Sequence, residues 1–148
     1  PKYQNPKPTF AWTLQQEYST TQGKALIMYL AITNISKLNN VKSLLRTACA
    51  FGCNGVFMVG KSKFNESEDV PIMIRQHIFS GKMPLLRFRK WDDFIDHLNK
   101  EDIILIGVEI QESSVNIDAL PVSAERKVAF LMGNEGQGIH PKHMASCK

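Results

Sequence analysis

The stretch KVAFLMGNEGQGI, residues 127–139, joins an uncharged apolar run to a turn with three glycines in six residues. The run has the length and composition of a strand that is buried on both faces, as in a parallel sheet. The glycines let the following backbone adopt positive φ angles and approach another molecule closely, and Pro141 suits the first position of a helix. Open α/β sheets bind ligands at such a strand, loop and helix start. The loop would also aim the Glu135 carboxylate at a ligand, although a purely structural turn explains a lone glycine loop as well.

The glycine spacing within this loop excludes one common nucleotide-binding pattern. The glycines fall at 133, 136 and 138, so the G-x-G-x-x-G spacing of dinucleotide-binding proteins is absent. The loop also lacks the G-K-[ST] of a phosphate loop. Its meaning therefore depends on other parts of the chain.

Composition and charge describe an ordinary globular chain with a slight basic excess. The 148 residues, 43% of them hydrophobic and 22% charged, suit one domain. The net charge of +4 favours, weakly, a polyanionic partner. The longest apolar runs are about eight residues, far below the roughly 20 that cross a bilayer. We therefore expect no membrane partner.

Apolar runs and helical periodicity alternate along the chain. Strands are expected at residues 24–32, 55–60, 83–88, 102–109 and 128–132. Helices are expected at residues 41–51, 72–80, 90–100 and from 141 onward, with one turn at 116–120 and a charged loop at 61–71. Strands that alternate with helices favour parallel pairing with right-handed crossovers. The pattern predicts an α/β domain with an open, mainly parallel sheet flanked by helices.

The domain is expected to occupy residues 24–148, after a polar and proline-rich N-terminal extension at 1–23. The three cysteines form no C-x-x-C pair, and with the four histidines they form no zinc spacing, so no metal is expected. His140 and His143 flank the expected helix start and are interpreted as surface histidines. We expect an intracellular, cytoplasmic location, because unpaired cysteines fit a reducing compartment.

Two more stretches combine with the glycine loop into a specific pattern. The first reads NVKSLLRTA at residues 40–48, followed by AFG at 50–52 and the strand at 55–60. The second is MGNEGQGI at residues 132–139, and IGVE at 106–109 lies between the two. In this order and spacing they resemble the SpoU/TrmH family of RNA ribose 2′-O-methyltransferases, within the knotted SPOUT superfamily. The resemblance covers roughly residues 26–148 and implies a trefoil knot where the C-terminal segment is present.

The resemblance implies S-adenosylmethionine as the methyl donor, RNA (tRNA or rRNA) as the substrate, and a homodimer. A flat adenine and a cationic sulfonium need close backbone approach and a few well-placed polar groups, which agrees with a glycine loop at a strand end. By analogy, the donor-binding residues are Val108, Glu109, Gly133, Asn134 and Gly138.

The resemblance also implies catalytic roles for Arg46, Glu135 and Asn40. The arginine of the first motif is proposed in this family to activate the hydroxyl, but a guanidinium with a pKa above about 12 is a poor base. We favour Arg46 as a bidentate anchor for a phosphate near the target nucleotide, with base catalysis as the secondary option. Glu135 would orient Arg46 or stabilise the donor. Asn40 would brace the site by hydrogen bonds or cap the helix, and a solvated helix residue remains the alternative for Arg46.

A run of cations interleaved with aromatic residues lies in the middle of the chain, where Phe88 and Trp91 alternate with basic residues. Cations that bind phosphate and aromatics that stack on bases suit looped or single-stranded RNA. The alternative is a solvated edge with Trp91 in the core. The RNA-binding candidates are Arg46, Lys82, Arg87, Arg89 and Lys90.

One part of the family pattern is not found. The third motif, a strand and helix with a Ser-Leu-Asn-type segment, does not occur before Lys148. We therefore expect the chain as given to bind the donor more weakly than micromolar. The leading hypothesis is an S-adenosylmethionine-dependent enzyme that methylates a ribose 2′-hydroxyl of tRNA or rRNA. The alternative is a non-catalytic RNA-binding module with a degenerate fold of the same type.

Overall fold

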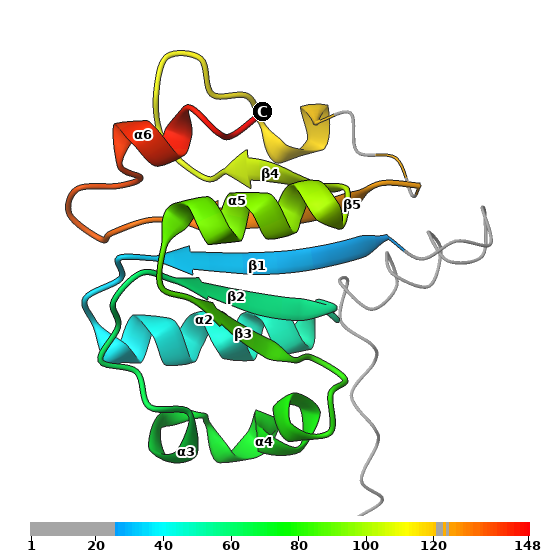
Figure 1. Cartoon of the computed structure of the whole chain (residues 1–148), viewed down its shortest axis with the longest axis vertical. Helices are drawn as coiled ribbons and strands as arrows, with labels where there is room; N and C mark the ends of the chain where they lie inside the picture. The colour runs from blue at the N-terminus through cyan, green and yellow to red at the C-terminus, as the bar shows by residue number, and fades with distance from the viewer. Residues whose placement is uncertain (1–25, 121–122, 124) are drawn as a thin grey trace, which may run out of the picture.

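A computed structural model describes residues 26–120, 123 and 125–148, and five parallel strands form its centre (Figure 1). The strands are β1 (Ile27–Thr33), β2 (Gly55–Val59), β3 (Leu85–Phe88), β4 (Ile103–Gly107) and β5 (Lys127–Met132). They lie in the order β3-β2-β1-β5-β4, and all four pairings are parallel. The prediction of an open parallel sheet flanked by helices is confirmed. The expected N-terminal extension at residues 1–23 lies outside the described residues.

Helices cover both faces of the sheet (Figure 1). On one face lie α2 (Leu38–Ala50) and α4 (Ile72–Phe79), whose buried residues share a core cluster, with the short α3 (Glu66–Asp69) before α4. On the other face lies α5 (Trp91–Lys100), and the C-terminal turn α6 (Pro141–Met144) packs beside it. A single 3-10 turn, η1 (Ile117–Ala119), precedes β5. No helix among the described residues is long and apolar enough to cross a bilayer.

The core has two parts, one on each side of the sheet. On the α2 side, Val41 and Leu45 are almost fully buried. On the α5 side, an aromatic group surrounds Phe57 of β2: its ring centroid lies 5.0 Å from that of Tyr29 and 5.6 Å from that of Phe94. Strand β2, which lies between β1 and β3, is buried at every position, as a strand between two helical layers must be.

The strand order places a crevice at the carboxyl ends of β1 and β5. From β1 the chain passes through α2 to β2, which pairs with one edge of β1. Strand β5 pairs with the other edge of β1, where Ile27 lies opposite Lys127 and Ile32 lies opposite Met132. Loops that diverge from neighbouring parallel strands leave a crevice between them, which is where such sheets bind ligands. The glycine loop after β5 and the loop between β1 and α2 therefore face each other.

Some element boundaries differ from the sequence prediction for identifiable reasons. The expected loop at 61–71 contains α3, because the Asn65 side chain accepts a hydrogen bond from the Ser67 N–H (3.1 Å) and caps a turn of helix. Helix α2 begins at Leu38, three residues before the predicted start, and neither Asn39 nor Asn40 is its N-cap. Strand β4 ends at Gly107, two residues before the predicted end.

The aromatic group on the α5 side should carry a large share of the stability. Replacing Phe94, which is 0% exposed, with alanine leaves a cavity, and we expect the free energy of unfolding to fall by about 3–5 kcal/mol in urea denaturation. The matched control is Phe79→Ala in α4, a side chain that is 62% exposed, which should cost about 0.5 kcal/mol or less. Similar losses in the two variants would contradict this description of the core.

Candidate functional site

Most of the predicted site residues line one cavity of about 410 Å³ between α2, the end of β4 and the glycine loop. All five predicted donor-binding residues and two of the three predicted catalytic residues contribute to it. The lining consists of Ile35, Asn40, Ser43, Leu44, Thr47, Val108, Glu109, Met132, Gly133, Asn134, Glu135 and Gly138. Residues from three distant parts of the chain thus meet at the carboxyl edge of the sheet.

Glu135 connects the glycine loop to the start of α2. Its carboxylate accepts hydrogen bonds from the N–H and the hydroxyl of Ser36 (3.1 and 3.0 Å), the N–H of Lys37 (3.0 Å) and the side-chain amide of Asn40 (3.0 Å). Helix α2 has no acidic residue in its first turn and no side-chain cap of its own, so this carboxylate supplies the negative charge that a helix N-terminus favours. Its own backbone N–H, with those of Lys37 and Ser36, lowers the pKa of Glu135 to about 2.

Asn134 shapes the glycine loop from within. Its side-chain oxygen accepts hydrogen bonds from the N–H groups of Gly136 and Gln137, both at 2.9 Å. Its backbone forms a two-way bridge with Gly138, at 3.0 and 2.9 Å, and its side-chain NH₂ donates to the carbonyl of Asn34 after β1 (3.0 Å). The loop is therefore a closed hairpin tied to β1. Asn134 lines the cavity as predicted, but its amide is largely occupied by the loop itself.

Two glycines of the loop fill positions where a side chain would not fit. A Cβ atom on Gly133 would lie 2.5 Å from the carbonyl carbon of Gly138. Gly138 itself has a φ of +68°, and a Cβ there would overlap the Glu109 carboxylate. The expected need for glycine thus has a specific cause: the two arms of the hairpin and the end of β4 are in direct contact.

Glu109 ties the end of β4 to the end of the glycine loop. One carboxylate oxygen accepts the N–H of Ile139 (2.8 Å) and the other accepts the N–H of Ile110 (3.0 Å). These two bonds, that of Ile139 first, lower the pKa of Glu109. The cavity therefore carries two carboxylates, Glu109 and Glu135, and no lysine or arginine among its lining residues.

Arg46 and Asn40 follow one another along the same helix, but their contacts differ from the prediction. Asn40 braces the site by donating to Glu135, as expected of a bracing residue, and does not cap α2. Arg46 is exposed and does not line the cavity. Its guanidinium donates a hydrogen bond to the hydroxyl of Ser43 (3.1 Å), a residue that does line the cavity. Within the described part of the chain Arg46 pairs with no carboxylate, so the predicted orientation of Arg46 by Glu135 is not observed.

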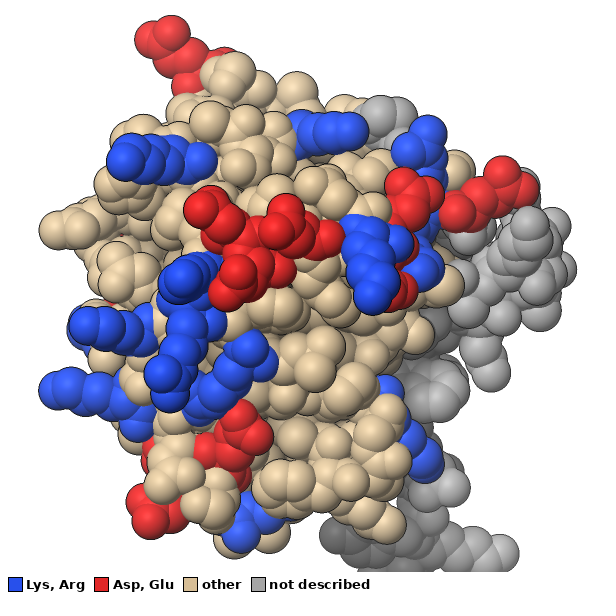
Figure 2. All heavy atoms as spheres, in the orientation of Figure 1, with Lys and Arg blue, Asp and Glu red and all other residues tan. Residues whose placement is uncertain are grey.

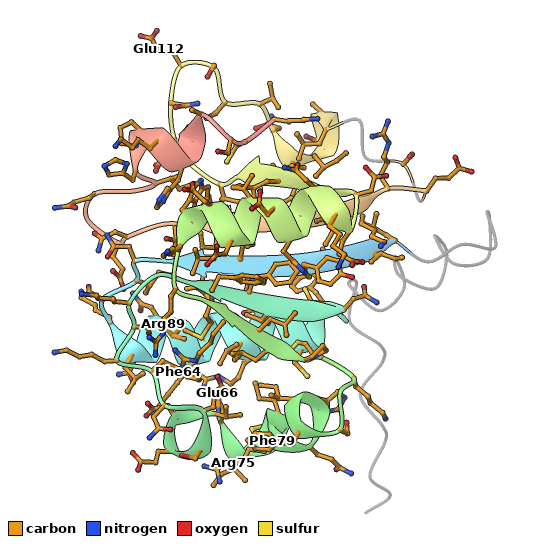
Figure 3. The ribbon with its side chains drawn as sticks, in the orientation of Figure 1. Phe64, Glu66, Arg75, Phe79, Arg89 and Glu112 are labelled. Carbon is orange, nitrogen blue, oxygen red and sulfur yellow. The ribbon has the colours of Figure 1, made fainter. Side chains whose placement is uncertain are left out.

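The structure does not gather the predicted RNA-binding cations into one patch. Lys82 precedes β3 and lies at the amino end of the sheet, whereas Arg89 and Lys90 follow β3 at the carboxyl end (Figure 3 labels Arg89). Arg87 is engaged by its own protein: it donates to Glu66 (2.7 Å) and to the carbonyl of Phe64, and its guanidinium lies over the Phe64 ring. The basic run in the sequence therefore splits between two ends of a strand.

The aromatic residues of that run are partly buried and pack against the core. Phe88 packs between Phe57 and Phe94, with ring centroids 6.1 and 5.5 Å apart. Trp91 stacks on His143 at a centroid distance of 3.8 Å and an angle of 14°. His140 is exposed, as interpreted from the sequence, whereas His143 is half-buried because α6 folds back onto α5. Among the described residues, no cluster of histidine, cysteine and carboxylate side chains could hold a metal ion.

Several residues of the site were not predicted from the sequence. Ser36, Ser43 and Thr47 lie near Asn40 and Arg46 on α2 and the loop before it. Nothing in the sequence distinguishes them, but Ser36 donates to Glu135 and the other two line the cavity.

One basic position of the site does have a recognisable sequence pattern. The stretch GVFMVGKS at residues 55–62 matches the spacing G-x-x-x-x-G-K-[ST]. Its first five residues form β2 and so cannot make a phosphate cradle. The pattern nevertheless places Lys61 at the carboxyl edge, beside the glycine loop.

The Glu135 contacts make a pH-dependent prediction. Because the pKa of the folded carboxyl lies below its ordinary 4.5, the carboxylate stabilises the fold above about pH 4.5, and this contribution is lost as the pH falls towards about 2. Glu135→Gln should therefore be less stable than the wild type at pH 7, and the difference should shrink across that window in urea titrations. The matched control is Glu112→Gln at the outward tip of a loop, where the stability difference should stay near zero (Figure 3). A pH-independent difference for Glu135→Gln would contradict the assignment.

Comparison with known proteins agrees with this fold. The AdoMet-bound rRNA methyltransferase from Sinorhizobium meliloti matches with a TM-score of 0.65 and 22% identity, over 82% of this chain and 44% of that chain. The SpoU methyltransferase AviRb from Streptomyces viridochromogenes, in complex with AdoMet, matches with a TM-score of 0.62 and 17% identity, over 82% and 46%. An RNA 2′-O ribose methyltransferase matches with a TM-score of 0.61 and 19% identity, over 82% and 45%.

This chain therefore spans less than half the length of these three proteins, and at such identities the matches show the fold. No curated protein matches it significantly in sequence. The model of the SpoU rRNA Methylase family matches residues 27–148, which is most of the chain. The chain belongs to the SpoU rRNA Methylase family.

Proposed function

We propose that this chain transfers a methyl group from S-adenosylmethionine to a ribose 2′-hydroxyl of tRNA or rRNA. The observation that carries the proposal is the cavity between α2, the end of β4 and the glycine loop. It joins the two sequence motifs that led to the family, through four hydrogen bonds to one carboxylate, Glu135. Family membership supports the same activity, as do the similar structures, which are methyltransferases, two of them with bound AdoMet and two of them acting on RNA.

The cavity fits the chemistry of this donor. Its two carboxylates and the absence of lining lysine or arginine suit a ligand with a sulfonium and an ammonium charge. Ile35, Leu44 and Met132 give it an apolar wall for a flat ring. A Cβ atom at Gly133 or Gly138 would collide with the other arm of the hairpin or with Glu109, so glycine at both positions keeps this wall of the cavity compact. When bound, S-adenosylmethionine supplies an electrophilic methyl group.

The two carboxylates act on binding and geometry in this proposal. Glu135 has a pKa of about 2 and already accepts four hydrogen bonds, so it is a poor proton acceptor near neutral pH. We assign it to positioning: it holds the glycine loop against α2. Glu109, bonded to the N–H of Ile139, holds the loop against β4. The proton of the ribose hydroxyl would then leave to water.

Arg46 would anchor the RNA beside this cavity. Its guanidinium is exposed and bonded only to the Ser43 hydroxyl within the described residues, so it can turn towards an incoming phosphate at little cost. A guanidinium binds phosphate with two parallel hydrogen bonds and stays charged at any pH the protein meets. Orientation of the ribose by such an anchor can contribute several kcal/mol to lowering the barrier, on the order seen for well-oriented intramolecular reactions.

The Arg46 role is tested by substitution. Arg46→Ala should reduce methyl incorporation by roughly 100-fold or more, while Arg46→Lys should recover only part of it, because a lysine keeps the charge and loses the bidentate geometry. Labelled donor at millimolar concentration and a tRNA or rRNA mixture form the assay, and resistance of the labelled linkage to alkaline cleavage identifies ribose 2′-O-methylation. The matched control is Arg126→Ala, which lies just before β5 at the amino end of the sheet and should leave the rate unchanged.

Undiminished activity of Arg46→Ala would overturn this assignment. The alternative function, a non-catalytic RNA-binding module, makes a different prediction in the same experiment. It expects RNA binding that the donor does not alter and no methyl incorporation by any variant.

A further inference from the structure

A second cavity, of about 430 Å³, lies on the other side of the glycine loop. It is formed by the carboxyl ends of β1 and β2, by the loop residues Gln137 and Gly138, and by the start of α6. Gly138 lines both cavities, so the glycine hairpin is the wall between them. No predicted RNA-binding residue contributes to this second cavity.

The two cavities have opposite charge. The first is lined by Glu109 and Glu135 without lysine or arginine, whereas the second is lined by Lys61, Lys142 and two histidines without any carboxylate. Neither lysine forms an ion pair within the described part of the chain. Figure 2 shows Lys and Arg side chains gathered on the side of the molecule to which the β1 arrow of Figure 1 points, the carboxyl side of the sheet. Two unpaired ammonium groups beside a cavity attract an anion.

Uncharged groups of this cavity can donate hydrogen bonds to an anion. The Nδ1 atom of His140 accepts the N–H of Lys142 (3.2 Å), so in the neutral ring the proton sits on Nε2, which becomes a donor. Gln137 adds a side-chain amide. His143 is held by its stack on Trp91, and burial, with the nearby His140, lowers its pKa. The permanent positive charge therefore comes from the two lysines.

The turn that carries Lys61 is open to a ligand. Gly60 has a φ of +85°, and no heavy atom of the described residues lies within 4 Å of the position its Cβ would occupy. The backbone thus turns sharply at the end of β2 and leaves Lys61 exposed at the cavity rim. By contrast Arg87, the central cation of the predicted basic run, is already bonded to Glu66 and Phe64.

We propose that this second cavity binds a backbone phosphate of the RNA near the nucleotide to be methylated, with Lys61 and Lys142 as its cations and His140 and Gln137 as hydrogen-bond donors. The inference rests on the proposed function, since it assigns the place where the substrate is held. A lysine binds phosphate as a point charge, so this contact positions the RNA without reading its sequence. The glycine hairpin then separates a cationic donor from an anionic substrate, and each lies against groups of opposite charge.

The test is the salt dependence of RNA binding. Fluorescence anisotropy with a labelled RNA hairpin, from 50 to 200 mM KCl, compares the wild type with the double variant Lys61→Ala/Lys142→Ala. The affinity of the variant at 100 mM KCl should fall by about tenfold or more, and the slope of log K against log salt should become shallower by about two, one for each phosphate contact. Both lysines are exposed, so the unfolding midpoint should not change.

The matched control removes the same charge elsewhere. Lys100→Ala/Arg126→Ala changes two exposed cations that precede β4 and β5 at the amino end of the sheet, and it should leave the slope unchanged. Equal losses in both double variants would overturn the inference, because the effect would then be general charge. Wild-type protein that binds no RNA would overturn the proposed function itself.

A further experiment distinguishes a phosphate of the RNA backbone from the phosphate of a free nucleotide as the ligand of this cavity. Millimolar AMP replaces the RNA hairpin in a titration that follows the intrinsic fluorescence of the protein. If AMP binding requires Lys61 and Lys142 while RNA binding does not, the cavity serves a free nucleotide, and the RNA assignment is wrong. Loss of RNA affinity in the lysine variant, with weak or no AMP binding in the wild type, supports it.

Discussion

The carboxylate of Glu135 holds the glycine loop against the first turn of α2, and the geometry of the site depends on that contact. It collects four donors from the loop before α2 and from Asn40, residues that are 95 to 99 positions away in sequence. The helix would otherwise begin without a side-chain cap or an acidic first turn. The same contact fixes the distance between the two family motifs. A single charge thus stabilises a helix terminus and assembles a cavity.

The backbone of the glycine hairpin is shaped by hydrogen bonds within the loop. Asn134 bridges to Gly138 through the backbone, and its side-chain oxygen accepts hydrogen bonds from two further N–H groups of the loop. Contacts with Asn34 and Glu109 then hold the loop from outside. Gly133 and Gly138 then allow the hairpin arms and Glu109 to touch. With side chains at these positions the wall would be thicker and the two cavities further apart. These two positions require glycine because the surrounding atoms leave no room for a side chain.

The sheet and the site motifs could be predicted from the sequence, because both follow from local patterns. Uncharged apolar runs such as residues 128–132 mark buried strands, and the parallel order follows from their alternation with helices. The partner of each polar side chain could not be predicted in this way. Asn40 suits a helix cap by type, yet it lies inside the first turn and donates to Glu135. That choice depends on a residue brought close only by the order of β1 and β5.

The contacts that a sequence does not show also explain why the basic run in the middle of the chain forms no single surface patch. A sequence shows that Arg87 and Phe88 alternate, but a strand sends neighbouring side chains to opposite faces, so cations and aromatics in one strand do not share a surface. Phe88 packs against the aromatic core, and Arg87 binds Glu66 of α3, a helix in a segment for which the sequence predicts a loop. Lys61, in contrast, follows a strand end, and its place at the carboxyl edge is fixed by the sheet.

The division of charge across the hairpin has a consequence for catalysis. An enzyme gains rate when binding energy from groups remote from the reaction is used to orient the reacting ones. Under the proposed function the phosphates of the RNA would supply such energy, whereas cations in the cavity proposed for the donor would repel its sulfonium. In the proposed arrangement, Lys61 and Lys142 lie behind the hairpin and Glu109 and Glu135 in front of it, so both ligands would bind without that conflict. Arg46 lies outside both cavities on α2, so in the proposed role its exposed guanidinium would hold the RNA without opposing the donor.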